Sequence, residues 1–234
     1  MNFSFSHFSS TGPRETNQDR LLEPIATERG VLLAIADGVG GSVGGERAAE
    51  IAIEAVRSST DVDDDLDAIF STTVLRIREE ASIRENFRKM ATTLTVALIS
   101  EQTISVRHVG DARAYHLRGN GLNTLSEDQT EVAELLRKGI ITRYQADRYP
   151  RRGVLTSALS SRADYQVFSR TVEWQAGDRL LLLTDGVYNS VPRRLILKLS
   201  LENAVVTDFI ANLQSLTEAS EPTDNYTALA VDLG

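Results

Sequence analysis

Residues 31–38 read Val-Leu-Leu-Ala-Ile-Ala-Asp-Gly, and residues 180–187 read Leu-Leu-Leu-Leu-Thr-Asp-Gly-Val. The apolar run at 31–36 is too short for a typical helix and lies between a glycine and Asp-Gly, so it predicts a strand buried on both faces. Each run leads into a carboxylate, Asp37 or Asp185, which opens the tripeptide Asp-Gly-Val. An ordinary turn at each Asp-Gly is the alternative interpretation. The helical pattern after Asp37, and the repetition of the tripeptide at Asp185, favour two strand ends that each carry a functional carboxylate.

Around these two strands, hydrophobic periodicity predicts runs of strands interrupted by pairs of helices. Helical spacing follows the glycine-rich residues 38–45 and recurs at about 66–87, where the acidic run 61–67 is assigned to the helix N-terminus. Capping boxes predict two short helices, one from Ser126 with Gln129 and one from Thr142 with Gln145. A further helix is predicted at 206–216, and further strands around Phe3 and Phe5 and at about 20–25, 92–100, 103–109, 112–117, 122–125, 166–172, 179–184 and 226–233. This order is typical of an α+β layered sandwich.

The composition limits the chemistry open to this chain. Its 33 acidic residues outnumber its 25 basic residues and give a net charge of −8, so we expect no nucleic-acid partner. The absence of cysteine excludes disulfides, thiolate zinc sites and cysteine nucleophiles. The three histidines lack the spacing of a histidine zinc centre. Any metal ion must therefore be held by oxygen atoms.

The sequence contains neither a secretory signal nor a membrane-spanning segment. Residues 1–8 have no basic segment that leads into an apolar one, and the longest purely apolar run is the six residues 31–36. We therefore expect a cytoplasmic protein without membrane insertion.

Four aspartates stand beside apolar runs rather than in polar stretches. Besides Asp37 and Asp185, Asp111 follows the segment 106–110, and Asp224 comes just before the last apolar strand. Carboxylates at the ends of buried strands repel one another unless a positive group joins them. The natural partner here is Mg²⁺ or Mn²⁺, because these hard cations prefer oxygen ligands. Two such ions can hold and ionise a water molecule, which is chemistry that hydrolyses phosphate esters.

Five motifs follow one another between positions 12 and 227. They are Gly12-Pro-Arg14-Glu-Thr-Asn17-Gln18-Asp19, Ala36-Asp37-Gly38-Val-Gly-Gly41, Val109-Gly110-Asp111-Ala-Arg113-Ala-Tyr115, Leu183-Thr-Asp185-Gly186 and Thr223-Asp224-Asn225-Tyr-Thr227. Each motif is weak alone, but the five in this order resemble the metal-dependent serine/threonine protein phosphatases of type 2C, the PPM family, in their compact bacterial form. Residues 139–159 resemble the flap segment of that family, which lies beside the active site.

The resemblance implies one catalytic domain over residues 1–234. Its fold would be α+β, a four-layer α-β-β-α sandwich in which two antiparallel sheets pack face to face between helix pairs. The periodicity described above is compatible with this fold but does not by itself identify it. We also expect the protein to be a monomer.

The resemblance also implies ligands for two divalent cations, Mn²⁺ or Mg²⁺. Asp37 would bridge both ions, the Gly38 carbonyl would bind the first ion, and Asp185 and Asp224 would hold the second. Arg14 would bind the substrate phosphate, a task that suits the planar fork of a guanidinium.

Three more residues receive roles from the same resemblance. Asp19 would orient the metal-bound water, while Gln18 and Asn225 would lie behind the ligands without touching the ions. A water or hydroxide bridging the two metals would attack phosphorus in line, and no covalent phosphoenzyme would form. The absence of cysteine agrees with direct attack by water.

Two positions depart from the family pattern. Some members carry a histidine directly after the second motif's Asp-Gly, proposed to protonate the leaving oxygen, but this chain has Val39. Several bacterial members bind a third metal with the aspartate of Gly-Asp-x-Arg and a second carboxylate. Asp111 matches the first ligand, whereas Asn189 replaces the second. Because an amide is a poorer ligand for a hard cation, we expect a weak third site or none.

These patterns predict a metal-dependent phosphatase that acts on phosphoserine and phosphothreonine in proteins. Its partners would be phosphorylated protein substrates and a bacterial eukaryotic-like serine/threonine kinase that it opposes. Two alternatives remain: a catalytically silent phosphatase-like module that binds a phosphoprotein, and a regulator phosphatase dedicated to one phosphoprotein.

Overall fold

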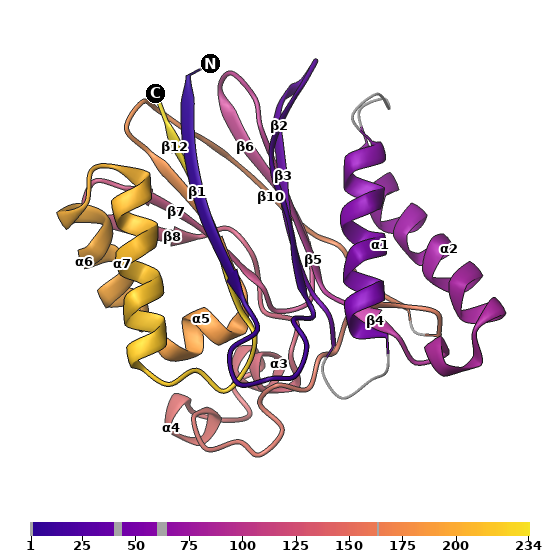
Figure 1. Cartoon of the computed structure of the whole chain (residues 1–234). Helices are drawn as coiled ribbons and strands as arrows, with labels where there is room; N and C mark the ends of the chain where they lie inside the picture. Colours follow the sequence, from indigo (N-terminus) through magenta and orange to yellow (C-terminus); the bar gives the residue numbers. More distant parts are fainter. Residues whose placement is uncertain (1, 40–43, 60–64, 163) are drawn as a thin grey trace.

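A computed structural model describes residues 2–39, 44–59, 65–162 and 164–234. Two five-stranded antiparallel sheets pack face to face, and helices cover both outer faces (Figure 1). The predicted α+β sandwich with four layers is therefore confirmed.

The two sheets are built from strands distant in sequence. The first sheet contains β1 (Phe3–Ser10), β7 (Arg113–Arg118), β8 (Gly121–Thr124), β11 (Arg179–Leu183) and β12 (Tyr226–Leu233). The second contains β2 (Asp19–Thr27), β3 (Gly30–Asp37), β5 (Leu94–Ile99), β6 (Thr103–Val109) and β10 (Phe168–Glu173). Their strand orders are β1-β12-β11-β7-β8 and β10-β6-β5-β3-β2. A separate short pair joins β4 (Ala91–Thr92) to β9 (Leu159–Ser160).

Helices form the two outer layers. Figure 1 shows α1 (Gly45–Ser58) and α2 (Asp67–Ile83) beside the second sheet, and α5 (Asp185–Ser190), α6 (Arg193–Glu202) and α7 (Val206–Ala219) beside the first. The short helices α3 (Glu131–Arg137) and α4 (Arg143–Ala146) lie at one end of the sandwich. The helix predicted at 206–216 and the capping box at Thr142 are confirmed.

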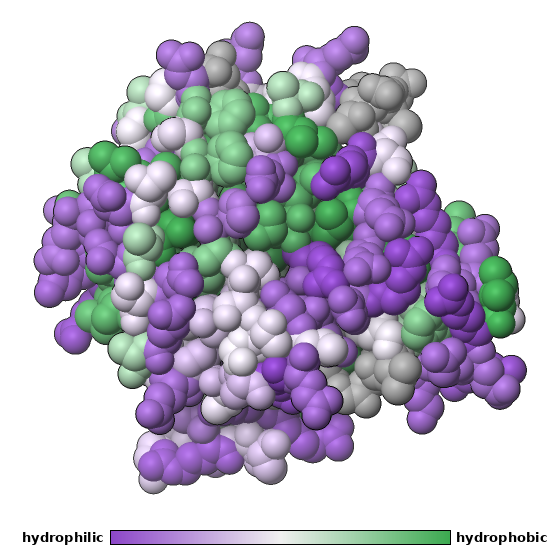
Figure 2. Space-filling view, viewed as in Figure 1, coloured by the Kyte–Doolittle hydropathy of each residue, from purple (hydrophilic) through white to green (hydrophobic). Residues whose placement is uncertain are grey.

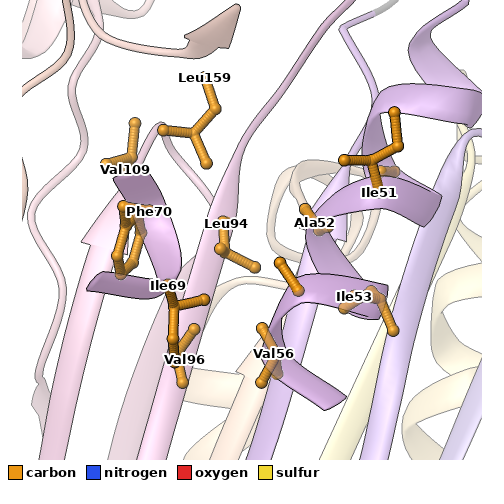
Figure 3. Packing of buried hydrophobic residues seen from close by; sticks show 14 of the residues in the cluster. Ile51, Ala52, Ile53, Val56, Ile69, Phe70, Leu94, Val96, Val109 and Leu159 are labelled. Atoms are coloured by element: carbon orange, nitrogen blue, oxygen red, sulfur yellow. The ribbon is translucent and has the colours of Figure 1, made fainter. Parts of the chain in front are cut away.

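The core explains why β3 and β11 have continuous apolar sequences. Leu33 of β3 and Leu182 of β11 point between the sheets, where they belong to one buried cluster. The alternate residues of the two strands face the helices, so both strands are buried on both faces. Behind β5, residues of α1 and α2 such as Ile51 and Phe70 belong with Leu94 to one buried cluster (Figure 3).

The open edge between β1 and β2 is more hydrophobic than the helical surface. Figure 2 shows hydrophobic atoms between these strands and hydrophilic atoms over α1. β1 pairs with β12 along its whole length, from Phe3 with Leu233 to Ser10 with Tyr226, so both chain ends lie together. Within the described part of the chain, no helix is long and apolar enough to cross a membrane.

Two predicted elements are divided in the structure. The helix predicted at 66–87 ends at Ile83, because Arg84 adopts an extended backbone, and a separate 3-10 turn follows at Glu85–Phe87. The strand predicted at 92–100 is interrupted at Thr93, whose N–H donates to the Asp37 carbonyl at 2.8 Å. The predicted helix start in the acidic run 61–67 and the glycine-rich segment 38–45 lie partly outside the described residues, which omit 60–64 and 40–43.

The capping box predicted at Ser126 and Gln129 is wrong. Helix α3 is capped instead by Thr130, whose hydroxyl accepts a hydrogen bond from the Ala133 N–H at 3.2 Å. The Ser126 hydroxyl accepts from the Ala114 N–H at 3.1 Å, and the Gln129 side-chain oxygen accepts from the Gly110 N–H at 2.8 Å. Ser126 therefore holds the loop after β8 to β7, and Gln129 holds it to the turn between β6 and β7.

Candidate active site

Three strand ends bring carboxylates together at one end of the sandwich. Asp37 is the last residue of β3, Asp185 follows β11 as the first residue of α5, and Asp224 lies two residues before β12. Asp19 begins β2 and is paired in register with Asp37. The site thus forms where the two sheets meet, and it depends on neighbouring strands of both.

Asp19 is the most deeply buried of these carboxylates, with an exposed fraction of 2%. Its Oδ2 accepts a hydrogen bond from the Thr184 hydroxyl at 2.8 Å, whereas its Oδ1 is buried without a hydrogen-bond partner among the described residues. Burial raises the pKa of Asp19 to about 7, and the like charges of Asp185 and Asp224 act in the same direction. A buried carboxylate oxygen without a donor is costly, so it calls for a positive partner.

The neighbouring carboxylates are perturbed in the same way. Burial raises the pKa of Asp37 well above its ordinary value, and the negative charge of Asp19 raises it further. Burial and the charge of Asp224 raise the pKa of Asp185 to about 6. These shifts mean that the ionised site lacks enough positive charge when only the protein's own residues are counted.

The donor set suits hard divalent cations. Carboxylates are ligands that Mg²⁺ and Mn²⁺ prefer, and the unpartnered oxygen of Asp19 lies in the same cluster. As the side chains stand, no group of three acidic or histidine side chains among the described residues lies close enough to hold one ion. The chemistry of the site therefore fits cations, while a closed set of ligands would require side chains to turn.

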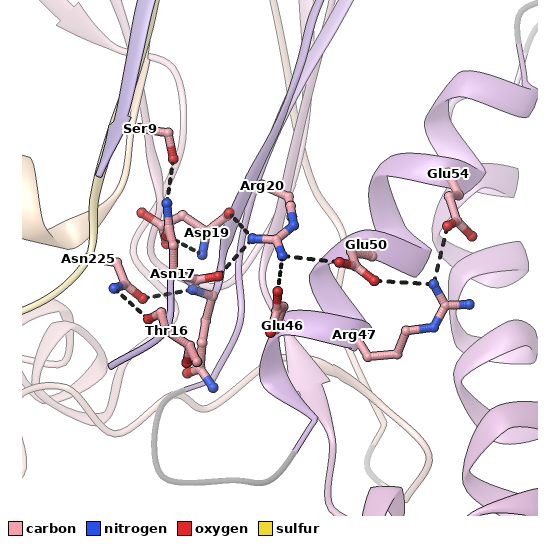
Figure 4. Close-up of polar contacts among 11 residues, drawn as sticks. Ser9, Thr16, Asn17, Asp19, Arg20, Glu46, Arg47, Glu50, Glu54 and Asn225 are labelled. Atoms are coloured by element: carbon pink, nitrogen blue, oxygen red, sulfur yellow. Dashed lines mark hydrogen bonds and ion pairs between the residues drawn. The ribbon is translucent and has the colours of Figure 1, made fainter. Parts of the chain in front are cut away.

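One cationic side chain already contacts this cluster. The Nη2 of Arg14 donates to Oδ2 of Asp224 at 2.8 Å, and about half of the Arg14 side chain is exposed. Its loop is held by Asn225, whose amide donates to the carbonyls of Thr11 and Thr16 at 2.7 and 3.0 Å and whose oxygen accepts from the Gln18 N–H at 2.9 Å. Figure 4 shows part of this network. Asn225 therefore ties the loop of Arg14 to the strand end of Asp224.

Two Asp-Gly glycines are required for close packing of the backbone. A Cβ at Gly38 would lie 2.4 Å from the Gly45 carbonyl oxygen, and one at Gly186 would lie 2.0 Å from the Asn225 carbonyl oxygen. The Gly38 N–H also donates to the Gln18 carbonyl at 3.1 Å. Glycine at each position thus lets the backbone of another segment, at Gly45 or Asn225, lie directly against the strand end that carries the carboxylate.

Asp111 lies beside this cluster and contacts residues that the sequence did not single out. It is 8% exposed, and its Oδ2 accepts from the Tyr188 hydroxyl at 3.4 Å. The Arg113 guanidinium stacks on the Tyr188 ring at 3.7 Å and donates to both carboxylate oxygens of Asp128. Burial raises the pKa of Asp111 to about 7, and the charge of Asp185 adds to this effect. No periodicity marks Tyr188 or Asp128, although Tyr188 directly follows an Asp-Gly-Val tripeptide.

Asn189 directly follows Tyr188 in the chain but contacts Asp185 rather than Asp111. Its amide donates to Oδ2 of Asp185 at 3.3 Å. At the position where Val39 stands, the side chain offers no proton donor.

A cavity of about 370 Å³ opens over the acidic cluster. Asp111, Asp185 and Asp224 are among its lining residues. The lining also includes Ala146 to Asp147 and Arg152 to Gly153, which belong to the segment 139–159. A ligand in this cavity would lie between the carboxylates and the flap segment.

Comparison with known proteins gives a consistent result. A family model described as "Protein phosphatase 2C" matches residues 9–230. The chain is 32% identical over 171 residues to the serine/threonine phosphatase stp of Listeria monocytogenes, which covers 69% of this chain and 68% of that protein.

Two solved structures have the same fold. The crystal structure of the serine/threonine phosphatase PstP/Ppp of Mycobacterium tuberculosis superimposes with a TM-score of 0.88 at 30% identity, covering 99% of this chain and 98% of that one. A structure of the PstP catalytic domain in complex with two manganese ions gives a TM-score of 0.84 at 29% identity, covering 98% of this chain and 97% of that one.

Proposed function

The chain belongs to the protein phosphatase 2C family and is a protein serine/threonine phosphatase by homology, and on this premise we propose that its acidic cluster hydrolyses phosphoserine and phosphothreonine with two divalent cations. The observation that carries the proposal is the convergence of Asp19, Asp37, Asp185 and Asp224, with one buried carboxylate oxygen left without a partner. Such a cluster becomes stable in its ionised form when cations join it.

The residues of the cluster would provide ligands for two divalent cations, Mn²⁺ or Mg²⁺. Asp37 would contact both, the Gly38 carbonyl would complete one site, and Asp185 with Asp224 would complete the other. Bound there, the cations would supply a polarised water as nucleophile and neutralise charge on the phosphoryl group. The structure of a relative with two manganese ions supports this number.

Other side chains position the reactants. Asp19 is fixed by the Thr184 hydroxyl and is available as an acceptor for a water proton. Arg14 is mounted on the loop that Asn225 holds, so its guanidinium can turn from Asp224 to a phosphate. Gln18 and Asn225 keep that loop in place without entering the cavity.

A third cation is expected to bind weakly or not at all. Of the described carboxylates that line the cavity beyond the two-cation set, Asp128 is paired with Arg113, and Asp111 already accepts a hydrogen bond from Tyr188. Asn189 contributes only an amide, whose nitrogen faces Asp185. With an amide at position 189, the position beside Asp111 therefore offers fewer anionic ligands than a hard cation prefers.

The proposed substrates are phosphorylated proteins, and the proposed opposing enzyme is a serine/threonine kinase of the same cell. The relatives from Listeria and Mycobacterium are both serine/threonine phosphatases, which supports this substrate class. We place the domain in the cytoplasm as part of the same proposal.

The test is hydrolysis of a phosphothreonine peptide by the purified chain with Mn²⁺. We expect turnover that EDTA abolishes and that Asp37→Asn reduces to background. The matched control is Asp208→Asn, which removes an exposed carboxylate from the first turn of α7 and leaves the rate unchanged. Folded protein without turnover in either Mn²⁺ or Mg²⁺ would contradict the proposal and favour a silent binding module.

A further inference from the structure

A basic groove lies at the sandwich edge opposite β1 and β2. It runs between the edge strands β8 and β10 and has a cavity volume of about 650 Å³. Its described lining residues include four basic side chains, His116, Arg118, Arg170 and Arg193, and one carboxylate, Glu173. A positive groove is notable because the whole chain carries a net charge of −8.

Two of the basic side chains already contact one buried carboxylate. Oδ2 of Asp178, which is 1% exposed, contacts both the His116 ring at 2.8 Å and the Arg118 guanidinium at 2.7 Å. Arg118 also donates to the Glu173 carbonyl at 2.9 Å. The buried carboxylate therefore fixes the floor of the groove and leaves little charge there for a ligand.

The remaining two arginines are held in place but have no anionic partner. Arg170 donates from Nη1 to the Thr124 carbonyl at 2.8 Å, and Arg193 donates from Nη2 to the Leu122 carbonyl. Across the described residues, neither guanidinium has a carboxylate within ion-pair distance. Because a guanidinium has further N–H donors, each can still bind an anion while one donor stays on the strand.

The hydrogen bonds of Arg170 and Arg193 also prevent another strand from pairing with the edge strand β8. Leu122 and Thr124 are alternate residues of β8, so their carbonyls point to the same side, and arginine side chains occupy both. A peptide that added a strand here would need those carbonyls. The groove therefore favours recognition of side chains rather than addition of a strand.

We propose that this groove binds an extended, carboxylate-rich segment of the protein substrate through Arg170 and Arg193. This proposal rests on the proposed function, because it concerns the substrate of the same site. Charge complementarity selects the occupant, since the two unpaired guanidiniums match acidic side chains.

The strand geometry places this segment relative to the phosphorylated residue. Asp111, which lies beside the acidic cluster, precedes Tyr115, which pairs with Thr124, and Arg118, which pairs with Gly121. At strand spacing the groove therefore extends from about 13 to about 23 Å beyond Asp111. An extended peptide covers that range between roughly four and seven residues from its phosphothreonine.

The experiment compares peptides that share one phosphothreonine. One carries a block of Asp and Glu four to seven residues away, a second carries Asn and Gln there, and a third carries phosphoserine there, with phosphate loss followed at the phosphothreonine alone. We expect a KM about fivefold lower for the carboxylate peptide than for the neutral one, as two exposed ion pairs would give. The Arg170→Gln/Arg193→Gln double variant should lose this difference, and added salt should weaken it.

The control is Arg57→Gln/Arg78→Gln, which removes the same charge from exposed positions on α1 and α2 and keeps the preference. No preference in the unaltered protein, or one that survives in the Arg170→Gln/Arg193→Gln variant, overturns the inference. Preference for the phosphoserine block without preference for the carboxylate block also overturns it, in favour of a phosphate site.

Two further measurements separate this inference from the proposed function. Hydrolysis of p-nitrophenyl phosphate, which is too small to reach the groove, should be equal in both double variants. Binding of the acidic peptide without phosphate, followed by fluorescence anisotropy, needs no turnover. Arginine-dependent binding by a protein that hydrolyses nothing would support the groove while refuting the proposed function, and hydrolysis without such binding would do the reverse.

Discussion

The free energy of unfolding of the metal-free protein should fall as the pH rises. A carboxyl group whose pKa is higher in the folded chain than in the unfolded chain holds its proton longer when folded. The unfolded state then binds fewer protons between the two pKa values, so stability is present at low pH and is lost as the pH rises through that window. For Asp19 the window extends from the ordinary value of 3.8 to about 7.

The size of the effect follows from that window. Between about pH 5.5 and pH 8 the unfolded carboxyl group is ionised throughout, whereas the folded group is first protonated and then ionised. Asp19 alone then lowers the free energy of unfolding by about 2 kcal/mol. For a chain of this size that corresponds to a fall in Tm of about 6 °C. Asp111, whose pKa is also raised to about 7, acts in the same direction.

The assay is thermal unfolding in EDTA across this pH range, repeated with saturating Mn²⁺. With saturating Mn²⁺ the fall in Tm between pH 5.5 and pH 8 should be much smaller, because cations stabilise the ionised carboxylates. Asp19→Asn should reduce the decline in EDTA, while Asp208→Asn at an exposed position should leave it unchanged. A Tm in EDTA that is constant or rises between pH 5.5 and pH 8 would refute this reasoning.

Three substitutions give further predictions. Arg14→Ala should raise KM for a phosphopeptide by about tenfold or more through loss of a charged phosphate contact, and steady-state kinetics with unchanged KM would argue against that role. Asn189→Asp should add a third Mn²⁺ per chain in calorimetric titration, and an unaltered stoichiometry would count against the account of Asp111. Gly186→Ala should destabilise the chain by more than about 2 kcal/mol because its Cβ would lie 2.0 Å from the Asn225 carbonyl oxygen. Gly153→Ala, with no heavy atom within 4 Å, is the control in denaturant unfolding, and equal losses for both would contradict the packing argument.

Strands buried on both faces could be predicted because their requirement is local. Residues 31–36 and 180–183 must be apolar at every position, and the sequence shows this directly. Helix α6 was not predicted, because apolar residues of 193–202 alternate with others as they would in a strand. Its Ile196 is fully buried, and Leu195 and Leu199 pack against the buried cluster that contains Phe209 of α7, so tertiary contacts decide the helix.

The wrong capping box has a similar cause. Ser126 and Gln129 have the required spacing, but the backbone N–H groups of Ala114 and Gly110 compete for their side chains. Those partners come from β7 and the loop before it, and no local pattern identifies them. Hydrogen bonds between distant segments can override a local capping signal.

The aspartates of the candidate site could be predicted from the sequence, whereas the side chains that contact them could not. Asp37 and Asp185 are marked by the strands before them, whereas the resemblance supplied the roles of Arg14 and Asp19. The contact of Tyr188 with Asp111 joins residues 77 positions apart and exists only in the folded chain.

The pairing of β1 with β12 has a practical consequence for engineering. The Gly234 N–H donates to the Asn2 carbonyl at 3.0 Å, so the two described ends are neighbours. They lie at the end of the sandwich away from α3 and α5 (Figure 1), about 25 Å of strand from the carboxylates. A short linker could therefore join the ends into a circular backbone, or a tag at either end could anchor the protein to a bead, and the cavity beside the carboxylates would still face outward.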